Sequence, residues 1–327
     1  MTVAPPLVSA RGITVTYQRR SLQWVGPKRQ PVQAVRGVDL DIMNGEVLAL
    51  VGESGSGKST LARVLVRAIE ASTGTVAFQG TDITHLDGEE LRDIRRHFQV
   101  VFQDPFGSLN PRLSIGAAIA EPLIVHKIAT GKVLRERVAE CLVMVGLEPS
   151  LAHLRPHEFS GGQRQRICIA RAIACKPQLI VADEALSALD PSLRDRMLDL
   201  FQDLKERFAL TYLFISHDLD VVQRISDRVA VMYLGRVVEI GATSDIYGHP
   251  RHPYTQALMA AVPVPDPVAE RRRRHASLPG EPPSPANPPP GCPFHPRCTR
   301  AIDRCRTQAP LLTEAAATHQ VACHLPD

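Results

Sequence analysis

The sequence lacks long apolar runs, a strong charge excess and abundant aromatic side chains. Its 327 residues contain no stretch of about 18 apolar residues, so we do not expect the chain to span a membrane by itself. Aromatic residues make up 5% and the formal net charge is +4, which argues against a nucleic-acid-binding surface. The first ten residues lack a charged segment followed by an apolar one, so we expect no signal peptide and a cytoplasmic location.

Cysteine is sparse before residue 290, where only Cys141, Cys168 and Cys175 occur. All three lie in apolar, periodic segments and are interpreted as small buried hydrophobic side chains. With 44% hydrophobic residues, the chain is long enough for one large domain and an appendage.

Short apolar runs alternate with helical patterns over much of residues 1–247. This alternation predicts an α/β domain with a mainly parallel sheet. Residues 105–155 interrupt it with helical patterns at 115–126 and 134–145, which predicts an inserted helical subdomain. Residues 18–33, which contain Trp24, are interpreted as a loop or hairpin insert. The expected strands are residues 13–17, 38–42, 46–51, 76–79, 100–103, 179–182, 212–216 and 229–234.

The composition changes at about residue 247, so residues 248–327 are interpreted as a separate extension. Twelve of the 27 prolines fall between Pro263 and Pro296, where regular structure is not expected. The same segment contains the arginine run Arg271 to Arg274. This run is interpreted as a solvated linker, with contact to lipid head groups or to a partner as the alternative.

A glycine-rich turn between an apolar strand and a helix predicts a phosphate-binding loop. The pattern G-x-x-x-x-G-K-[ST], the P-loop, lets backbone N–H groups converge on phosphate oxygens at a helix N-terminus. Lys58 is expected to neutralise the β- and γ-phosphates, and Ser59 to bind Mg²⁺. The P-loop residues are Gly52, Glu53, Ser54, Gly55, Ser56, Gly57, Lys58 and Ser59, with Thr60 as a further ATP-binding residue.

Two acidic residues follow the apolar run 179–182. Carboxylates at the carboxyl end of a buried strand lie where α/β sheets bind ligands. Asp183 is expected to join the Mg²⁺ shell, and Glu184 to act as the general base for the attacking water. A pair of solvated acids at a strand end is the alternative that the pair alone would leave open.

A second serine- and glycine-rich turn, Ser160-Gly161-Gly162-Gln163, opens the helical stretch 163–174. With Phe159 before it, this turn resembles the signature motif of ABC ATPases, in which leucine more commonly leads. A simple helix cap by Ser160 is the alternative. The resemblance implies that two cassettes face each other and that ATP lies between the P-loop of one and the signature of the other.

Other positions resemble the same family in order along nearly the whole chain. Gln103 resembles the Q-loop glutamine that senses Mg²⁺ and the γ-phosphate, and His217 the switch histidine. Tyr17 is the candidate to stack on adenine, with a core aromatic as the alternative. Ala185 departs from the family, which usually has proline there; we expect altered loop stiffness and intact chemistry. The D-loop is expected at Ser187, Ala188, Leu189 and Asp190.

Two segments resemble the dipeptide and oligopeptide importers within this family. They are the run 101–112 and the His252-Pro253-Tyr254-Thr255 motif. The resemblance implies a subunit at the cytoplasmic face of a membrane, powering import with two permease subunits and an extracytoplasmic solute-binding protein. The insert near Trp24 resembles one of two paired ATPases, which implies a heterodimer with a paralogue. Nickel or another small solute is the alternative substrate, and a soluble, non-transport ABC ATPase the alternative class.

Four cysteines close the sequence: Cys292, Cys298, Cys305 and Cys323. Because the tail is too rich in proline to form a core, we expect a metal to hold it together. Some peptide-importer ATPases are similar in carrying a [4Fe–4S] cluster on such a tail, and four thiolates suit that cluster. Zinc, with help from His295, His319 or His324, and free thiols are the alternatives.

Overall fold

The structure is a computed structural model that describes residues 5–18, 31–187, 189–262, 280–316 and 318–326. The chain forms two compact units. One, the helical unit, contains residues 42–47 and 85–216; the other, the P-loop unit, contains the described parts of residues 5–41, 48–84 and 217–327. The expectations for Trp24, for most of the 18–33 insert and for the arginine run 271–274 lie outside the described residues.

Three parallel strands form the sheet of the helical unit. They are β6 (Phe98–Val101), β7 (Leu179–Asp183) and β8 (Thr211–Ile215). Val101 lies opposite Ala182, and Asp183 opposite Ile215. All of β8 and the first four residues of β7 are buried, which is typical of parallel strands covered on both faces.

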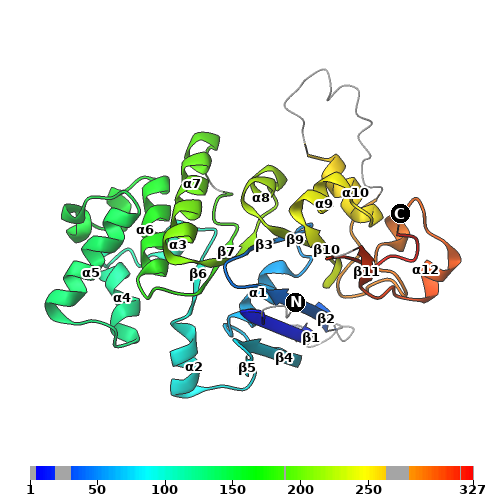
Figure 1. Ribbon diagram of the computed structural model, residues 1–327, viewed down its shortest axis with the longest axis horizontal. Helices are drawn as coiled ribbons and strands as arrows, with labels where there is room; N and C mark the ends of the chain where they lie inside the picture. Colours follow the sequence, from blue (N-terminus) through cyan, green and yellow to red (C-terminus); the bar gives the residue numbers. More distant parts are fainter. Residues whose placement is uncertain (1–4, 19–30, 188, 263–279, 317, 327) are drawn as a thin grey trace, which may run out of the picture. The chain divides into compact units, whose positions relative to one another are not determined.

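The helices of this unit occupy the predicted insertion and flank the strands. No strand occurs between residues 105 and 155, all of which the structure describes, so the helical insertion is confirmed. Helices α4, α5 and α6 lie together in the green part of Figure 1 and pack through buried aliphatic side chains. The helices are α2 (Gly88–Arg95), α3 (Pro105–Ser108), α4 (Ile115–Val125), α5 (Gly131–Met144), α6 (Gly161–Ile173) and α7 (Pro191–Phe208), with 3-10 turns η1 (Pro149–His153) and η2 (Pro156–Glu158).

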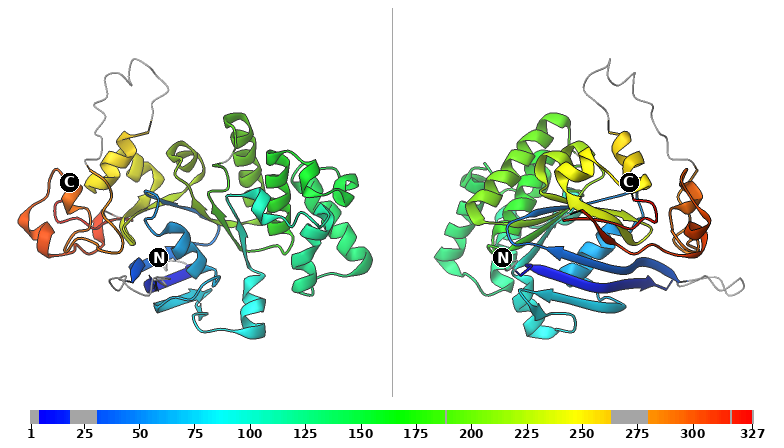
Figure 2. Two further views of the ribbon diagram at one scale, coloured as in Figure 1. Left: turned by 180° about the vertical axis from the view of Figure 1, so that it is seen from behind. Right: turned by 45° about the vertical axis from the view of Figure 1, so that its right-hand side comes forward.

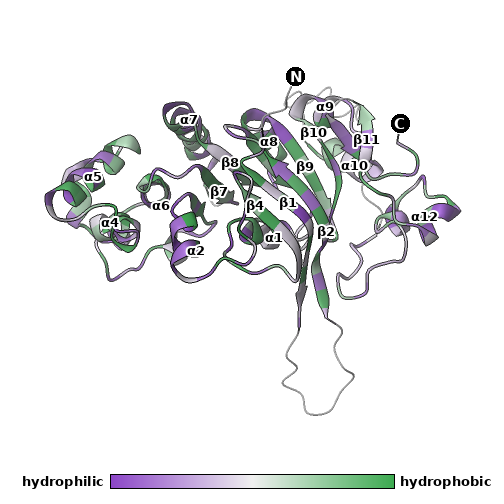
Figure 3. Ribbon diagram, turned by 60° about the horizontal axis from the view of Figure 1, so that its bottom comes forward, coloured by the Kyte–Doolittle hydropathy of each residue, from purple (hydrophilic) through white to green (hydrophobic). Residues whose placement is uncertain are grey.

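Hydropathy separates the covered strands from the exposed helices. Figure 3 contrasts the hydrophobic β7 with the largely hydrophilic α2, in which no residue is buried. The α/β class predicted from alternating apolar runs is therefore confirmed in this unit.

The P-loop unit combines an antiparallel sheet with a mixed set of strands. The antiparallel sheet has the order β2 (Val32–Ile42), β1 (Val8–Tyr17), β4 (Thr73–Phe78) and β5 (Thr81–Asp82). In the mixed set, β3 (Val47–Val51) runs parallel to β9 (Arg228–Tyr233), with Val51 opposite Val231. The other strands of the set are antiparallel: β10 (Arg236–Ala242), β12 (His319–Val321) and β11 (Thr313–Ala316).

Several boundaries differ from the sequence predictions. The sequence pattern after the P-loop predicts a helix over residues 58–70, whereas helix α1 (Lys58–Leu65) is shorter. It ends early because Arg67 takes a left-handed backbone conformation, φ 54°, and its Nε donates to the Ile83 carbonyl at 2.9 Å. Strand β6 ends at Val101, so Gln103 lies in a loop. The sequence patterns did not predict strands β5, β10, β11 and β12.

The other helices of this unit are α8 (Leu219–Ile225), α9 (Thr243–Gly248), α10 (Pro253–Ala260) and α12 (Asp303–Thr307), with the 3-10 turn η3 (His295–Arg297).

The C-terminal tail, residues 280–326, gains its apolar contacts from the rest of the P-loop unit. The tail lies beside α9 and α10 in both views of Figure 2. Phe294 is 2% exposed and packs edge-on against Tyr233 of β9, with ring centroids 5.3 Å apart. Tyr254 of α10 completes the cluster, 4.7 Å from the Tyr233 ring and 5.5 Å from that of Phe294. A segment too poor in apolar residues for its own core therefore joins an existing one.

A buried carboxylate fixes the tail at a second place. Glu239 of β10 is fully buried and accepts hydrogen bonds from the backbone N–H groups of Arg251 and His252 and from the ring of His319, at 2.7, 2.9 and 2.7 Å. Because a buried carboxylate without partners is costly, this contact holds β12 beside β10.

Within the described residues, no helix has the length and apolar character needed to cross a bilayer.

Candidate functional site

The predicted phosphate loop lies between the buried strand β3 and helix α1. Gly52 has φ 144°, and a Cβ there would lie 2.2 Å from the Met232 carbonyl oxygen. Gly57 has φ 104°, and a Cβ there would lie 2.3 Å from the Ala34 carbonyl oxygen. Glycine is therefore required at both Gly52 and Gly57, because the backbone conformation disfavours any side chain and because a Cβ would overlap a carbonyl oxygen. No acidic residue occupies the first turn of α1, which leaves the positive end of this helix available to an anion.

Lys58 lies within the loop that it is expected to serve. Its Nζ donates to the carbonyl oxygens of Gly52 at 2.7 Å and Glu53 at 2.9 Å, and lies 3.4 Å from the Ser56 hydroxyl. The side chain is 6% exposed. The loop thus holds the ammonium group beside the N-terminus of α1, where a phosphate would meet both.

Glu53 makes contacts that the sequence did not reveal. Its backbone N–H donates to the Tyr254 hydroxyl at 2.9 Å, and its carboxylate accepts two hydrogen bonds from Arg297, at 2.9 and 3.1 Å. Arg297 lies 244 residues away in the tail, so no local pattern could have paired the two. Burial opposes the charge of Arg297, but its bonds to Glu53 and Tyr233 raise its pKa above the ordinary value.

Tyr254 belongs to the His252-Pro253-Tyr254 segment noted in the sequence. His252 caps α10, with its Nδ1 accepting from the Tyr254 N–H at 3.0 Å, and Pro253 occupies the first helical position. Burial lowers the pKa of His252 to about 3, which keeps the ring neutral. The segment therefore forms an ordinary helix start, and it also delivers the Tyr254 hydroxyl to the P-loop.

The acidic pair ends strand β7 in the helical unit. Asp183 is the last residue of the strand and is half-buried. Glu184 has φ 50°, a left-handed conformation, and its N–H donates to the Ile215 carbonyl of β8 at 2.9 Å. Strain of this kind in a non-glycine residue persists where neighbouring contacts impose it. The turn therefore directs the chain sharply away from the sheet immediately after Asp183.

The D-loop positions follow this turn. The Ser187 hydroxyl donates to the Glu184 carbonyl at 2.9 Å, and Ala185 is buried at the position where the family has proline. Asp190 caps α7 by accepting from the Leu193 N–H at 3.0 Å, a bond that lowers the pKa of this carboxyl group. Ala188 lies outside the described residues.

The signature positions start helix α6 in the helical unit. The Ser160 hydroxyl accepts from the Gln163 N–H at 3.3 Å, and the Ser160 N–H donates to the Gln163 side chain at 3.0 Å. This reciprocal pair is a capping box, so the helix-cap interpretation of Ser160 is correct as far as it goes. A Cβ at Gly161 would meet no atom within 4 Å, whereas one at Gly162 would lie 3.1 Å from Leu193.

The remaining predicted residues lie in exposed positions. Gln103 lies in the exposed loop before α3, the helix that Asp104 caps by accepting from the Phe106 N–H at 2.9 Å. Tyr17 ends β1 with 44% of its surface exposed, which excludes the core-aromatic alternative. His217 is exposed and begins the last chain segment of the P-loop unit. The predicted nucleotide residues are thus divided between the two units.

The four tail cysteines line one small cavity. Cys292, Cys298, Cys305 and Cys323 surround it together with Phe294 and the start of α10, and none forms a disulfide. Burial raises the pKa of Cys292 to about 11 and raises those of Cys298 and Cys323. Among the described residues, no three His, Cys, Asp or Glu side chains lie close enough together to hold a metal ion. The thiols therefore share one space without converging to ligand distances.

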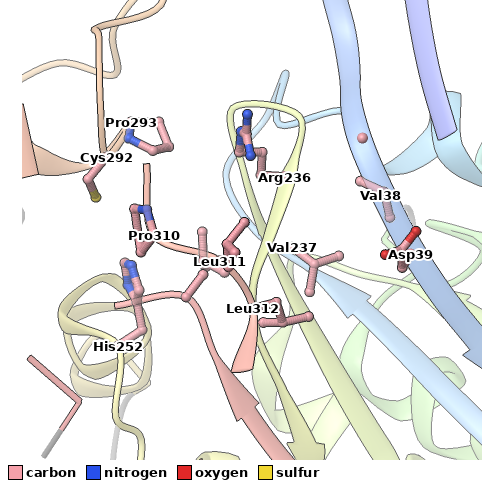
Figure 4. A pocket seen from close by; sticks show the side chains of 13 residues that line it. Val38, Asp39, Arg236, Val237, His252, Cys292, Pro293, Pro310, Leu311 and Leu312 are labelled. Atoms are coloured by element: carbon pink, nitrogen blue, oxygen red, sulfur yellow. The ribbon is translucent and has the colours of Figure 1, made fainter. Parts of the chain in front are cut away.

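A neighbouring cavity shares His252 and Cys292 with the first. It measures about 320 Å³, and Figure 4 shows these two residues on one side, Val38 and Asp39 on the other, and Val237 between them. The tail residues Pro310, Leu311 and Leu312 complete its wall.

The other three cysteines lie in the helical unit. Cys141 and Cys168 are each 1% exposed and Cys175 is partly buried; burial raises the pKa of all three thiols to about 11. The interpretation as small core residues is confirmed for Cys141 and Cys168.

The fold and the two glycine-rich helix starts define the class as an ATP-binding cassette. The family model described as "ABC transporter" matches residues 35–187, and the model described as "Oligopeptide/dipeptide transporter, C-terminal region" matches residues 238–305. A solved dimeric ATP-binding cassette, MJ0796 bound to ADP and phosphate, is 31% identical with a TM-score of 0.64. The match covers 72% of this chain and 98% of that one.

Curated relatives match over nearly the whole length. The oligopeptide transport ATP-binding protein AppF of Bacillus subtilis is 52% identical over 90% of each chain. The oligopeptide transport ATP-binding protein OppF of Salmonella typhimurium is 48% identical over 92% of this chain and 90% of its own. The chain belongs to the family of ATP-binding subunits of oligopeptide and dipeptide ABC transporters, and its catalytic class is that of an ABC ATPase.

Proposed function

We propose that this chain hydrolyses ATP to power the import of oligopeptides, from the cytoplasmic face of a membrane. The observation that carries the proposal is the 52% identity to an oligopeptide transport ATP-binding protein over 90% of both chains. The C-terminal region model supports the same substrate class, since it begins at residue 238 and includes the His252-Pro253-Tyr254 segment. Two permease subunits and an extracytoplasmic solute-binding protein complete the proposed transporter.

The transport test is reconstitution with the two permease subunits of the transporter in lipid vesicles, together with the binding protein. Oligopeptide is expected to stimulate ATP hydrolysis and to accumulate on the side of the membrane that carries the ATPase subunits. Ni²⁺ ions are expected to do neither. Stimulation by Ni²⁺ alone would replace the peptide substrate by a metal solute. ATP hydrolysis that responds to no permease would instead favour an ABC ATPase without a transport role.

For ATP, we assign Lys58 to the β- and γ-phosphates and Ser59, Gln103 and Asp183 to Mg²⁺. The confinement of the Lys58 ammonium within its loop supports the first assignment. The proposed catalytic residues are Glu184, as the general base, and His217, as the switch histidine. Tyr17 is the proposed contact for adenine, and its exposure at the end of β1 supports that role.

A second cassette is proposed to complete each ATP site. The open space around Gly161 supports this, because a partner's phosphate could approach the start of α6 without meeting a side chain. The chain has one set of motifs, so the partner is a second copy or, as we propose, a paralogue. The positions that would face the partner's nucleotide are Ser160, Gly161, Gly162 and Gln163, with Ser187, Leu189 and Asp190 beside them.

The helical insertion is the proposed docking surface for a permease. Several large apolar side chains are exposed on it, including Phe106 at 63% and Val143 at 60%. Arg164 of α6 lies over the Phe106 ring, 3.9 Å from its centroid, which links the signature helix to the segment after Gln103. Cross-linking from cysteines placed at 106, 124 and 133 is expected to capture a permease loop. Cross-links to the other ATPase alone would contradict this assignment.

For the tail, we propose that the four cysteines hold one [4Fe–4S] cluster. The support is the ligand count, the absence of disulfides and the single cavity that all four thiols line. Buried thiols with raised pKa values need a cationic centre before they become thiolates, and bound iron would supply it. The cluster would be structural or regulatory, because ATP hydrolysis requires no electron transfer.

Anaerobic purification tests this proposal against zinc and against free thiols. Brown protein with about four irons per chain is expected. Serine at any one of the four positions should remove the colour, whereas Cys168→Ser serves as the matched control and should retain it. Colourless protein with stoichiometric zinc, or without metal, would contradict the cluster and leave the ATPase function unaffected.

A further inference from the structure

Glu53 of the P-loop is held at all three of its polar groups. Its carbonyl oxygen accepts from Lys58 Nζ at 2.9 Å, its N–H donates to the Tyr254 hydroxyl at 2.9 Å, and its carboxylate binds the two terminal nitrogens of Arg297. Two of these three contacts come from the C-terminal extension. The residue that supports the phosphate-binding lysine is therefore itself positioned by the extension.

Arg297 is built into the unit rather than lying on its surface. Its side chain is 5% exposed, against 25% for that of Glu53, and its Nη1 also reaches the Tyr233 hydroxyl at 3.4 Å. It ends the turn η3, between Cys292 and Cys298, and Phe294 of the same segment packs on Tyr233. The order of the cysteine-bearing segment and the position of the Arg297 guanidinium are thus linked.

The pair also balances charge where a polyanion is to bind. Without Arg297, the Glu53 carboxylate would stand unneutralised in the loop that receives the ATP phosphates and would oppose them. Two parallel N–H···O bonds hold the carboxylate by direction as well as by charge. Partial burial keeps this attraction from being fully screened by salt.

We infer that Arg297 is a positioning residue for nucleotide binding, through which the four-cysteine tail sets the affinity of the P-loop. It acts through Glu53 in two ways, by neutralising its charge and by fixing the carbonyl that holds Lys58. The inference extends the proposed function by making the tail a part of the nucleotide site. It holds whether iron, zinc or no metal occupies the cysteine cavity, because it depends on the position of Arg297 alone.

Equilibrium binding of MgATP and MgADP to the full-length chain tests the inference. Arg297→Gln is expected to weaken MgATP binding about tenfold, and MgADP binding less because ADP carries less charge. The double variant Glu53→Gln/Arg297→Gln removes both charges and should restore MgATP affinity to within about threefold of wild type. Arg306→Gln, which removes an exposed tail arginine, is the matched control and should leave affinity unchanged.

The double variant separates a charge-positioning role from a purely structural one. If Arg297 only stabilised the fold, neutralising Glu53 would not recover affinity, and that result would overturn the inference. Wild-type MgATP affinity in folded Arg297→Gln would also overturn it. Should Arg297→Gln fail to fold, Arg297→Lys retains the buried cation with a single point of contact. A loss of about threefold is then expected, and no loss would contradict the inference.

Discussion

The chain has two glycine-rich helix starts, and they differ in what surrounds them. At the P-loop, Gly52 and Gly57 have positive φ angles, and added Cβ atoms would overlap backbone carbonyl oxygens at 2.2 and 2.3 Å. At the signature, Gly161 requires no special φ angle and has open space where a Cβ would lie. Backbone atoms of the same unit therefore require glycine in the P-loop. At Gly161, no atom of the same unit fills the space that a Cβ would occupy.

This difference shows that glycine serves two purposes in one protein. In the P-loop it permits a backbone conformation that no other residue can take without strain. At Gly161 it withholds a side chain from a surface, which matters only if something else approaches. Variants that separate these two purposes test the comparison, and so do variants that separate phosphate binding from chemistry.

The largest expected effect is on the rate of ATP hydrolysis, and it comes from Glu184, which belongs to neither glycine-rich helix start. If both turns only bind phosphate, hydrolysis depends on the base, and Glu184→Gln should lower kcat of the assembled transporter by about 10²–10⁴-fold while ATP binding persists. Single-turnover hydrolysis and equilibrium nucleotide binding would be measured in parallel. Arg207→Gln, a surface change on α7, is the control. Turnover within a few-fold of wild type would remove Glu184 from this role.

The variant Lys58→Ala tests phosphate binding by the P-loop. Removing the ammonium that Gly52 and Glu53 hold should weaken ATP binding by about 100-fold, because a charged contact to phosphate is lost. Binding of a labelled ATP analogue measures the change. Lys205→Ala, in the last turn of α7, removes an equal charge from the helical unit and should not affect binding. Unchanged affinity of the Lys58 variant would contradict the P-loop assignment.

A matched pair of glycine substitutions, one in each turn, tests whether the two glycines serve different purposes. Gly57→Ala should lower the free energy of unfolding by about 3 kcal/mol, since both φ 104° and the Ala34 carbonyl oppose a Cβ. Gly161→Ala should leave it unchanged or raise it by about 0.5 kcal/mol, yet lower ATPase activity in the assembled transporter. Chemical denaturation and ATPase assays provide the two readouts. Equal losses of stability would show that the two turns do not differ as described.

Sequence patterns located the turns but not the long-range contacts that hold them in place. Local spacing was sufficient for the P-loop, the acidic pair after β7 and the helix start at Ser160, because each motif lies within a few residues of chain. It could not connect Glu53 to Arg297, since that contact depends on how residues far apart pack in three dimensions. Strands β11 and β12 were missed for a related reason: β12 pairs with β10 and β11 pairs with β12, and neither short strand has a distinct periodicity.

The last and smallest effect concerns Ser160, which caps α6 and is also a proposed phosphate contact. Ser160→Ala removes the hydroxyl that accepts from Gln163 and should cost about 1 kcal/mol of stability. Ser160→Asp keeps a good cap at the same position and should preserve stability, but it adds a negative charge. If a partner's ATP binds there, the aspartate variant should lose more ATPase activity than the alanine variant, although it is the more stable of the two. If Ser160 is only a cap, activity will follow stability, and the aspartate variant will be the more active. Thermal unfolding and ATPase rates of the assembled transporter, measured on the same preparations, decide between these orders.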